Sequence, residues 1–485
     1  MVERQAPPSD DTASGTASGA ASGAGARTEA PPGPHVLFDV TTCHYNRGRV
    51  MTGIPRVELN LAAAIAEALG DAVTFLRYDA KTGEAVIEPA ATVLAWGREA
   101  PTEKLGRSET GIFARSRVLA AIASRHSPVR RLGRALERGV RKGRRRLWRA
   151  LGRSAPSGGG AVAPLAGSGA ASGTTSGAVN GAASTAALAE RLAGLGGRPL
   201  VFLHVGADWL AAEMLALIRR AAGGPVEARV LVHDLLPLDF PEFYPEDFRR
   251  RFAAYVEDFV VPADRHFAYS DYTRGRLAAR AGLAPERVTR VHLPTDMSAL
   301  KDIEPSPVAA VAARGEPFFL TVGVVSMRKN QAFLVDVWQQ GLTRGQAMPL
   351  LVIAGSLLSS GDAYPLALYR RVQADPALRD RIVFVENASD AELVWLYRSC
   401  QGFLFPSLAE GWGLPVTEAL AFGKPCLISD RTAVPEAGMG RAVVLEIQHQ
   451  DWLDHLFTGP TKITEKVSSE HIRYSWKNVI SDALA

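Results

Sequence analysis

The stretch "GFLFPSLAEGWGLPVTEALAFG", residues 402–423, joins a short apolar run to a helical stretch through a turn that contains two glycines. The run "GFLFPS" is typical of a buried strand, because it is short, apolar and rich in aromatic residues. The part that follows, "LPVTEALAFG", has a proline in its first turn and a glycine at its end, as helices do. A strand that leads through a turn into a helix is the repeating unit of an α/β fold.

The same alternation extends outward on both sides of this stretch. Short apolar runs alternate with helical stretches over residues 35–300 and again over residues 316–460. This pattern predicts an α/β protein with two facing Rossmann-like, doubly wound domains, and a closing helix within residues 461–485. The expected strands are "HVLFDVT", "AVTFLRY", "ATVLAW", "LVFLHV", "ARVLVHD", "RHFAYS" and "RVTRVHL" in the first domain, and "FFLTVG", "PLLVIAG", "RIVFVE", "GFLFPS" and "KPCLIS" in the second.

The composition is that of a soluble globular protein. With 485 residues the chain is too long for one core, and its 47% hydrophobic and 22% charged residues are ordinary values. The cysteines Cys43, Cys400 and Cys426 have no metal or redox spacing, which favours a reducing cytoplasm. Residues 1–34 are rich in Ala, Gly, Ser and Pro without an apolar core, which predicts a disordered tail and not a signal peptide.

A basic and Gly/Ser-rich insertion interrupts the first domain at about residues 101–191. Residues 130–153 contain eleven basic residues and one acid, so the net charge of +5 for the whole chain leaves −5 for the remainder. The basic character is therefore local, which argues against a nucleic-acid-binding body. The Gly/Ser-rich part has the composition of a flexible linker, and no stretch is expected to span a membrane.

Within this insertion, residues 129–153 predict a cationic amphipathic helix. Valines and leucines recur at helical spacing and arginines occupy the other positions, a pattern suited to lying on an anionic membrane surface. Two alternatives stay open for this segment: a mostly disordered insert without function, and nucleic-acid binding.

The turn at residues 408–413 is the first candidate site. Gly411 and Gly413 allow close approach of the backbone, and the helix that starts at Leu414 presents unpaired N–H groups and a partial positive charge that suit a diphosphate. Glu410 on the turn could bind sugar hydroxyls, and Glu418 inside the helix could accept from a ribose. The structural alternative is an ordinary loop and helix with two solvated acids.

Three other stretches follow predicted strands or precede helices. After the strand that ends at Gly323, the adjacent cations Arg328 and Lys329 could neutralise a leaving diphosphate, or they could be a solvated pair. His233 and Asp234 end a strand of the first domain and could contact a transferred sugar, although a lone histidine is often structural.

The turn "TGIPR", which contains Gly53 and leads into a helix, could contact the donor phosphate or the acceptor. A turn before a helix is its structural alternative. In "YSDYTRGRL", Ser270 and Thr273 have the pattern of a helix cap, which explains them without any binding role.

The blocks "EGWGLP", "RKN", "HDLLPLDFPE", "AYSDYTR" and "MTGIPR" occur in an order that resembles the retaining glycosyltransferases of family 4. The resemblance covers about residues 36–484 apart from the insertion. It implies a GT-B fold, a nucleotide-sugar donor bound mainly by the second domain, transfer with retention of anomeric configuration, and a glycan or lipid-linked acceptor. A preference for mannose from GDP-mannose is a weaker implication of the same motifs.

By this resemblance Glu410 holds the donor sugar's hydroxyls, Glu418 the ribose and Lys329 the diphosphate, while His233 faces the sugar. The loop "VENASD" matches the one beside the nucleobase, and the position after Gly323, which is an arginine in many members, is Val324 here. Glu410, His233 and Lys329 are the implied catalytic residues. The implied substrate-binding residues are Arg328, Gly323, Gly411, Trp412, Gly413, Leu414, Glu418, Gly53 and Asn387.

The chain has no D-x-D motif of the kind that holds a divalent metal in many glycosyltransferases. Lys329, Arg328 and helix N-termini must then stabilise the departing diphosphate, so no metal cofactor is expected. Retention would suit front-face attack. A covalent carboxylate intermediate is the alternative, with Asp234 as its weak candidate. Two other functions stay open: a nucleotide-sugar epimerase on the same fold, and a non-catalytic nucleotide-sugar-binding subunit of a membrane-associated complex.

Overall fold

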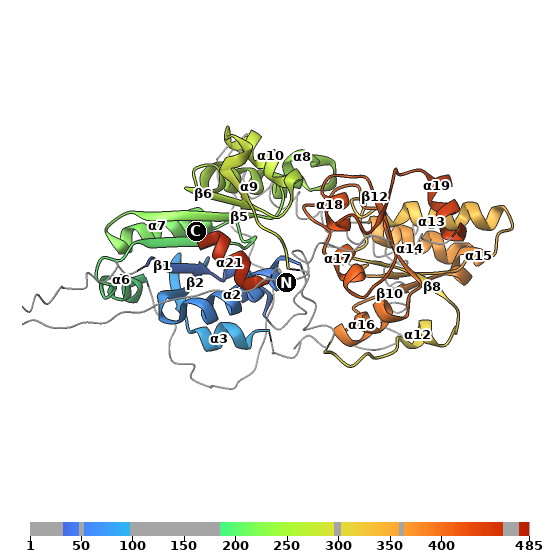
Figure 1. Cartoon of the computed structure of the whole chain (residues 1–485), viewed down its shortest axis with the longest axis horizontal. Helices are drawn as coiled ribbons and strands as arrows, with labels where there is room; N and C mark the ends of the chain where they lie inside the picture. The colour runs from blue at the N-terminus through green and yellow to red at the C-terminus, as the bar shows by residue number, and fades with distance from the viewer. Residues whose placement is uncertain are drawn as a thin grey trace, which may run out of the picture.

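The computed structural model describes residues 33–47, 53–97, 185–294, 302–357, 363–458 and 475–484. The predicted tail, the basic segment at 129–153 and most of the insertion lie outside these residues. Within the described part, the strands form two separate sheets, each with helices around it, in two bodies placed side by side (Figure 1). The predicted α/β class with two Rossmann-like domains is confirmed.

The first domain contains a seven-stranded sheet in the order β3-β2-β1-β4-β5-β6-β7. All neighbours are parallel except β3, which pairs antiparallel with β2 at one edge. Side chains from both faces are buried, because Val36 and Phe38 of β1 belong to one hydrophobic cluster and Leu37 between them to another. The strands are β1 (His35–Asp39), β2 (Val73–Asp79), β3 (Glu84–Glu88), β4 (Leu200–His204), β5 (Val226–Val232), β6 (Arg265–Ala268) and β7 (Val288–Arg290).

The helices of the first domain follow the expected alternation. Ser270 caps α10, where its side chain accepts a hydrogen bond from the Thr273 amide, so the predicted cap is confirmed. The helices are α1 (Thr41–Asn46), α2 (Ile54–Leu69), α3 (Ala90–Ala95), α6 (Thr185–Ala193), α7 (Ala211–Ala222), α8 (Leu236–Asp239), α9 (Glu246–Tyr255) and α10 (Asp271–Ala281).

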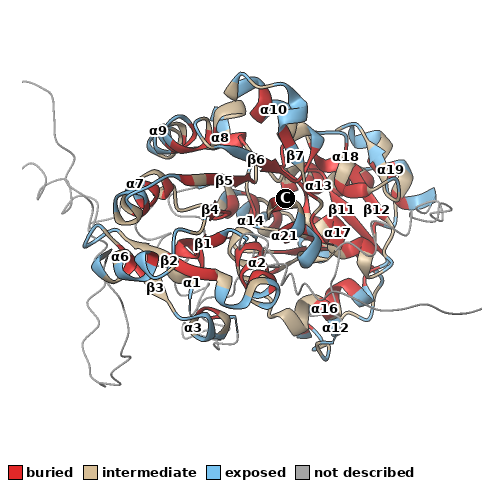
Figure 2. Cartoon of the chain, turned by 60° about the vertical axis from the view of Figure 1, so that its left-hand side comes forward, coloured by how far each residue is buried: buried red, intermediate tan, exposed pale blue. Residues whose placement is uncertain are grey.

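The second domain contains a six-stranded, fully parallel sheet in the order β10-β9-β8-β11-β12-β13. Its inner strands are buried and its edge strands are partly exposed. The surrounding helices expose their outer faces (Figure 2). The strands are β8 (Phe318–Val322), β9 (Leu350–Ala354), β10 (Ile382–Val385), β11 (Gly402–Phe405), β12 (Cys426–Ser429) and β13 (Val443–Leu445); the helices are α12 (Ala309–Ala312), α13 (Gln331–Thr343), α14 (Tyr364–Ala374), α15 (Pro376–Arg381), α16 (Asp390–Ser399), α17 (Leu414–Ala421), α18 (Val434–Gly438) and α19 (His449–Thr458).

Two expectations at the far edge of the first domain were wrong. The run "ATVLAW" is not a strand but helix α3, whose buried side chains Val93 and Trp96 are one helical turn apart. The strand at this edge is β3, residues 84–88, which follows a tight turn after β2. The insertion also ends earlier than residue 191, because helix α6 buries Leu188 in the core of the first domain and packs against α7.

The C-terminal helix α21 (Trp476–Leu484) leaves the second domain and packs against α2 of the first (Figure 1). Arg229 of β5 donates a 2.7 Å hydrogen bond to the carbonyl of Ala483, and Lys477 pairs with Glu67 at 2.6 Å. The closing helix expected within residues 461–485 thus lies at residues 476–484, on the surface of the first domain. None of the described helices has the length and apolar character needed to cross a membrane.

The carboxyl ends of β8, β9 and β10 leave no room for an added methyl group at one position. A Cβ atom on Gly355 would lie 1.9 Å from the carbonyl oxygen of Gly323. The Gly323 amide also donates to Ala354 and the Gly355 amide to Val385, both at 2.9 Å. This close packing fixes where the chain leaves β8 toward the candidate site.

We expect Gly355→Ala to destabilise the protein by about 2–3 kcal/mol, because the backbone at Gly323 must move to admit the methyl group. Urea unfolding measures the change. Gly275→Ala is the matched control, because Gly275 lies exposed inside α10 with open space around it. This variant should have a free energy of unfolding about 0.5–1 kcal/mol above that of the wild type, since alanine favours a helix more than glycine does. Equal stabilities for the two variants would contradict the packing argument.

Candidate active site

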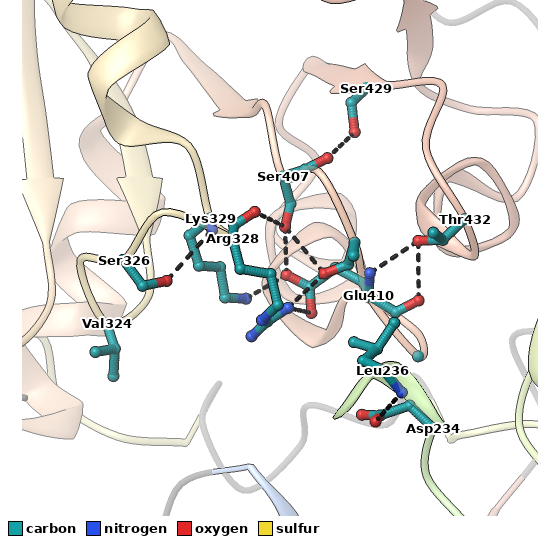
Figure 3. A network of polar contacts seen from close by, with 12 residues as sticks. Asp234, Leu236, Val324, Ser326, Arg328, Lys329, Ser407, Glu410, Ser429 and Thr432 are labelled. Atoms are coloured by element: carbon teal, nitrogen blue, oxygen red, sulfur yellow. Dashed lines mark hydrogen bonds and ion pairs between the residues drawn. The ribbon is translucent and has the colours of Figure 1, made fainter. Parts of the chain in front are cut away.

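Glu410 lies on the turn between β11 and α17, where two cations and a hydroxyl hold its carboxylate (Figure 3). Lys329 Nζ is 2.8 Å from Oε1, Arg328 Nη1 is 2.8 Å from Oε2, and Ser407 Oγ donates to Oε1 at 2.6 Å. Thr432 fixes the backbone of Glu410 on both sides, as acceptor from its amide and donor to its carbonyl. We call Arg328, Lys329, Ser407 and Glu410 the Glu410 cluster.

The charges in the Glu410 cluster stabilise one another. Burial by itself would raise the pKa of Glu410, but Arg328 and Lys329 overcome it and lower this pKa to about 2. Burial lowers the pKa of Lys329, which Glu410 opposes, and Glu410 raises the pKa of Arg328 in spite of its burial. The carboxylate of Glu410 is therefore ionised at neutral pH.

The sequence after β8 positions both cations. Gly323 has φ +141°, and an added Cβ there would lie 3.3 Å from Cε of Lys329, so the lysine side chain runs directly beneath this glycine. Its Nζ is also 4.7 Å from the ring centroid of Phe405. The Leu408 amide donates to the carbonyl of Arg328 at 2.8 Å, which ties this loop to the turn that carries Glu410. Val324 is 50% exposed and points away from Glu410 (Figure 3).

Glu418 lies in α17, with its side chain 12% exposed. The hydroxyl of Tyr397 donates to its Oε2 at 2.7 Å, and Nη1 of Arg56 in the first domain is 3.8 Å from its Oε1. Burial raises the pKa of Glu418, while Tyr397 and Arg56 oppose this shift. The solvated position that the structural alternative requires is thus excluded for Glu418 and, at 7% exposure, for Glu410.

The glycine turn touches the first domain. Ser270 Oγ donates to the carbonyl of Gly411 at 2.8 Å, and a Cβ on Gly411 would lie 2.2 Å from the carbonyl oxygen of His233. Gly413, with φ +127°, is the N-cap of α17, and Leu414 begins that helix. The side chain of Trp412 is buried in a hydrophobic cluster that includes residues of both domains. Only glycine allows the turn to approach the first domain this closely.

His233 and Asp234 follow β5 and face this turn, His233 with its carbonyl oxygen and Asp234 with its Cβ atom. His233 donates from Nε2 to the carbonyl of Val205 at 2.7 Å, and burial lowers its pKa to about 4, so its imidazole is neutral. Asp234 accepts from the Leu236 amide at 3.0 Å, and burial raises its pKa.

Gly53 and Asn387 take no part in the hydrogen bonds of the Glu410 cluster. Gly53, with φ +61°, is the N-cap of α2, and Asn387, with φ +53°, lies in the loop before α16. The structure thus brings together Glu410, Lys329 and Arg328, and sets the Gly411 turn against His233. Sequence reasoning missed the hydroxyls of Ser407 and Tyr397. The position of Ser407 at the end of the "GFLFPS" strand was the available signal for one of them.

A second charged group lies at the carboxyl ends of β1 and β4. Ligand atoms of Asp39, His204 and Asp208 lie within 4.8 Å of one another, the geometry of a possible metal site. His204 Nδ1 is 2.8 Å from Asp39 and 4.0 Å from Asp208. Although burial favours the neutral imidazole, Asp208 and Asp39 raise the pKa of His204, and burial raises the pKa of Asp208 to about 6. The two acids therefore favour the protonated form of His204 against the effect of burial.

One family model matches a large part of the second domain. Residues 302–438 match the model of the family "Glycosyl transferases group 1", a range that includes the whole Glu410 cluster and Glu418. The chain resembles a serotype-specific mannosyltransferase WbdA of Escherichia coli, with 29% identity over 225 residues, which are 44% of this chain and 26% of that protein.

Two further relatives match a similar share of this chain. The O-antigen chain mannosyltransferase B of Escherichia coli is 25% identical over 42% of this chain and 53% of its own length. A D-inositol 3-phosphate glycosyltransferase of Nocardia farcinica is 29% identical over 41% of this chain and 45% of its own length. The chain therefore spans about a quarter to half of the length of these relatives.

One solved structure resembles the whole chain. Anabaena Alr3699/HepE in complex with UDP and glucose superposes with a TM-score of 0.50 at 14% identity, over 92% of this chain and 94% of that one. At this identity the likeness concerns the two-domain GT-B arrangement alone. Residues 302–438 of this chain therefore match the group 1 glycosyl transferases in sequence, and the chain as a whole has the two-domain GT-B fold.

Proposed function

We propose that this chain is a retaining glycosyltransferase of family 4 that moves a hexose from a nucleoside-diphosphate sugar to a glycan or lipid-linked acceptor in bacterial surface polysaccharide biosynthesis. The observation that carries the proposal is the Glu410 cluster. A buried carboxylate held between Lys329 and Arg328 lies on the turn before α17, within the residues that match the group 1 glycosyl transferases.

In the proposed reaction the nucleoside diphosphate leaves with growing negative charge while the sugar gains positive character. Lys329 and Arg328 would stabilise the departing diphosphate, because preorganised cations in a buried site act without reorganising. Glu410 would keep both cations in place and accept hydrogen bonds from the sugar hydroxyls. Glu418, which lies within α17, would hold the ribose of the nucleoside.

Retention is proposed to follow front-face attack guided by the departing phosphate. A covalent intermediate would need an ionised carboxylate as nucleophile. Asp234 is poorly suited to this role, because it accepts a hydrogen bond from Leu236 and burial raises its pKa. His233 would contact the sugar as a neutral group.

Mannose is the proposed sugar, since two of the relatives described above are named mannosyltransferases and the "RKN" and "HDLLP" motifs resemble such members. We place the reaction in the cytoplasm, peripheral to the inner face of the membrane. The segment proposed for anionic membrane binding, residues 129–153, lies outside the described residues.

A donor screen tests the proposal. The purified chain is incubated with UDP-, GDP- and ADP-sugars, and thermal stabilisation and glycosyl transfer to oligosaccharide acceptors are recorded. We expect one nucleotide series to stabilise the protein and its sugar to appear in a glycan with the donor's anomeric configuration. Formation of an isomerised donor would identify an epimerase instead, and binding without transfer or hydrolysis would identify a non-catalytic subunit.

We expect Glu410→Gln and Lys329→Ala each to lower turnover by about two to three orders of magnitude, because each removes a charge that acts on the reacting groups. Steady-state transfer rates measure the effect. Lys477→Ala is the matched control, because this exposed lysine also forms an ion pair, with Glu67, and should keep wild-type rates. Wild-type turnover in both site variants would exclude this site.

We expect EDTA to leave the transfer rate unchanged, because Lys329 and Arg328 supply the positive charge that a metal ion supplies in other transferases. The rate is compared before and after dialysis against the chelator. Loss of activity that manganese restores would contradict the metal-independent mechanism and direct attention to Asp39, His204 and Asp208.

The neutral state of His233 predicts a dependence of stability on pH. Burial lowers the pKa of His233 from 6.5 to about 4. At pH values between these two, His233 is therefore protonated in the unfolded chain and neutral in the folded chain. The contribution of His233 to the free energy of unfolding is fully present above pH 6.5 and is lost as the pH falls toward 4. We expect His233→Gln to lose about 2 kcal/mol less stability between pH 7 and pH 5 than the wild type does.

Urea unfolding at the two pH values measures this difference. The control His449→Gln replaces a histidine with a side chain that is 45% exposed, and it should behave as the wild type. The same pH dependence in His233→Gln and the wild type would show that His233 is not held neutral.

A further inference from the structure

Arg56 reaches from the first domain to two carboxylates of the second. It lies in the first turn of α2, and its Nη2 donates to Oδ1 of Asp390 at 3.1 Å while Nη1 is 3.8 Å from Oε1 of Glu418. Asp390 begins α16, and Glu418 lies within α17. One guanidinium thus connects α2 with two helices of the other sheet.

The position of Arg56 is unfavourable for α2 taken alone. A cation in the first turn lies against the positive end of the helix dipole, and this turn contains no acidic residue or side-chain cap that would offset it. The charge must therefore be balanced from outside the helix. In the structure Asp390 and Glu418 provide this balance from the second domain.

Glu418 is flanked by positive charge from two directions. Arg56 approaches from the first domain, and Lys329, which is bonded to Glu410, also acts electrostatically on Glu418. A nucleotide sugar with its ribose at Glu418 and its sugar at Glu410 would carry its diphosphate between these two acids. The cations that pair with these two acids are Lys329 and Arg328 at Glu410 and Arg56 at Glu418. Val324 contributes no charge at the position after Gly323.

We propose that Arg56 is a donor-binding residue which the first domain contributes to the nucleotide site of the second. In the free chain its guanidinium pairs with Glu418; when the donor binds, the ribose hydroxyls take over this carboxylate and Arg56 moves to the diphosphate. The inference rests on the proposed function, in which Glu418 holds the ribose.

This exchange distinguishes nucleosides from nucleoside diphosphates. A nucleoside must displace Arg56 from Glu418 and offers it no new partner, whereas a diphosphate offers charged oxygens that suit a guanidinium. Arg56 has a side chain that is 26% exposed and Asp390 one that is 40% exposed, so this ion pair is weak and can be exchanged.

The test compares Arg56→Gln with the wild type by calorimetric titration with three pairs of ligands: UDP and uridine, GDP and guanosine, and ADP and adenosine. We expect the diphosphate that binds the wild type to bind Arg56→Gln about ten-fold more weakly, because one charge-assisted contact is lost. The corresponding nucleoside should bind as well as before or more tightly, because Glu418 is no longer occupied.

Arg290→Gln is the matched control. Arg290 is also an arginine of the first domain that pairs with an acid of the second, since its Nη2 is 3.4 Å from Glu436, but it does not approach Glu418 or the Glu410 cluster by any contact described above. This variant should keep the wild-type ratio of diphosphate to nucleoside affinity. The control thus distinguishes the effect of weakening the contact between the domains from the effect of removing the Arg56 side chain.

The outcomes separate the two levels of the proposal. If UDP, GDP or ADP binds the wild type and Arg56→Gln weakens the diphosphate and the nucleoside equally, Arg56 is only a link between domains and the inference is wrong. The inference is also wrong if the ratio of diphosphate affinity to nucleoside affinity in Arg56→Gln equals that in the wild type. If none of the three diphosphates binds the wild type, the proposed function itself is wrong, and the role of Arg56 with it.

Discussion

The candidate site depends on one buried ion pair network, the carboxylate of Glu410 between Lys329 and Arg328. Removing one partner of a buried pair leaves an uncompensated charge, which costs about 3 kcal/mol or more, so the three side chains require one another. The network also joins two strand–helix connections, since both cations follow β8 and Glu410 follows β11. The parallel sheet brings these connections together because β8 and β11 are neighbours within it. A sheet with another strand order would separate the charges.

The first domain completes the arrangement by steric fit and by charge. The turn at Gly411 lies so close to the carbonyl of His233 that no side chain fits, and the amides of Asp271 and Tyr272, at the start of α10, bind the carboxylate of Glu436 at 2.7 and 2.9 Å. Helix α21 returns to the first domain after the second is complete. The chain therefore crosses between the domains twice, and the residues proposed to act on one donor come from both.

Much of the fold was predictable from local patterns. Eleven of the twelve expected strands are present, because a parallel strand buried on both faces is a short apolar run that is easy to recognise. The failures lie at the edges. In "ATVLAW" a short apolar run fits a strand or a helix, and packing against α2 favours the helix. In β3 only three apolar residues stand between two glutamates at a half-buried edge, which is a weak strand signal. Helix α6 was assigned to the linker because the residues before Leu188 are small, like those of the linker itself.

The sequence by itself determined which residue types stand on the turns of the second domain. Glu410, Lys329 and the glycines were identifiable because each lies within a few positions of a strand end or helix start, and such local spacing is written along the chain. Only the tertiary structure decided what these groups meet. Arg56 and Asp390 are 334 positions apart and belong to different domains, and the raised pKa of His204 depends on acids from separate segments. Contacts of this kind arise from the packing of whole domains, for which no local pattern carries information.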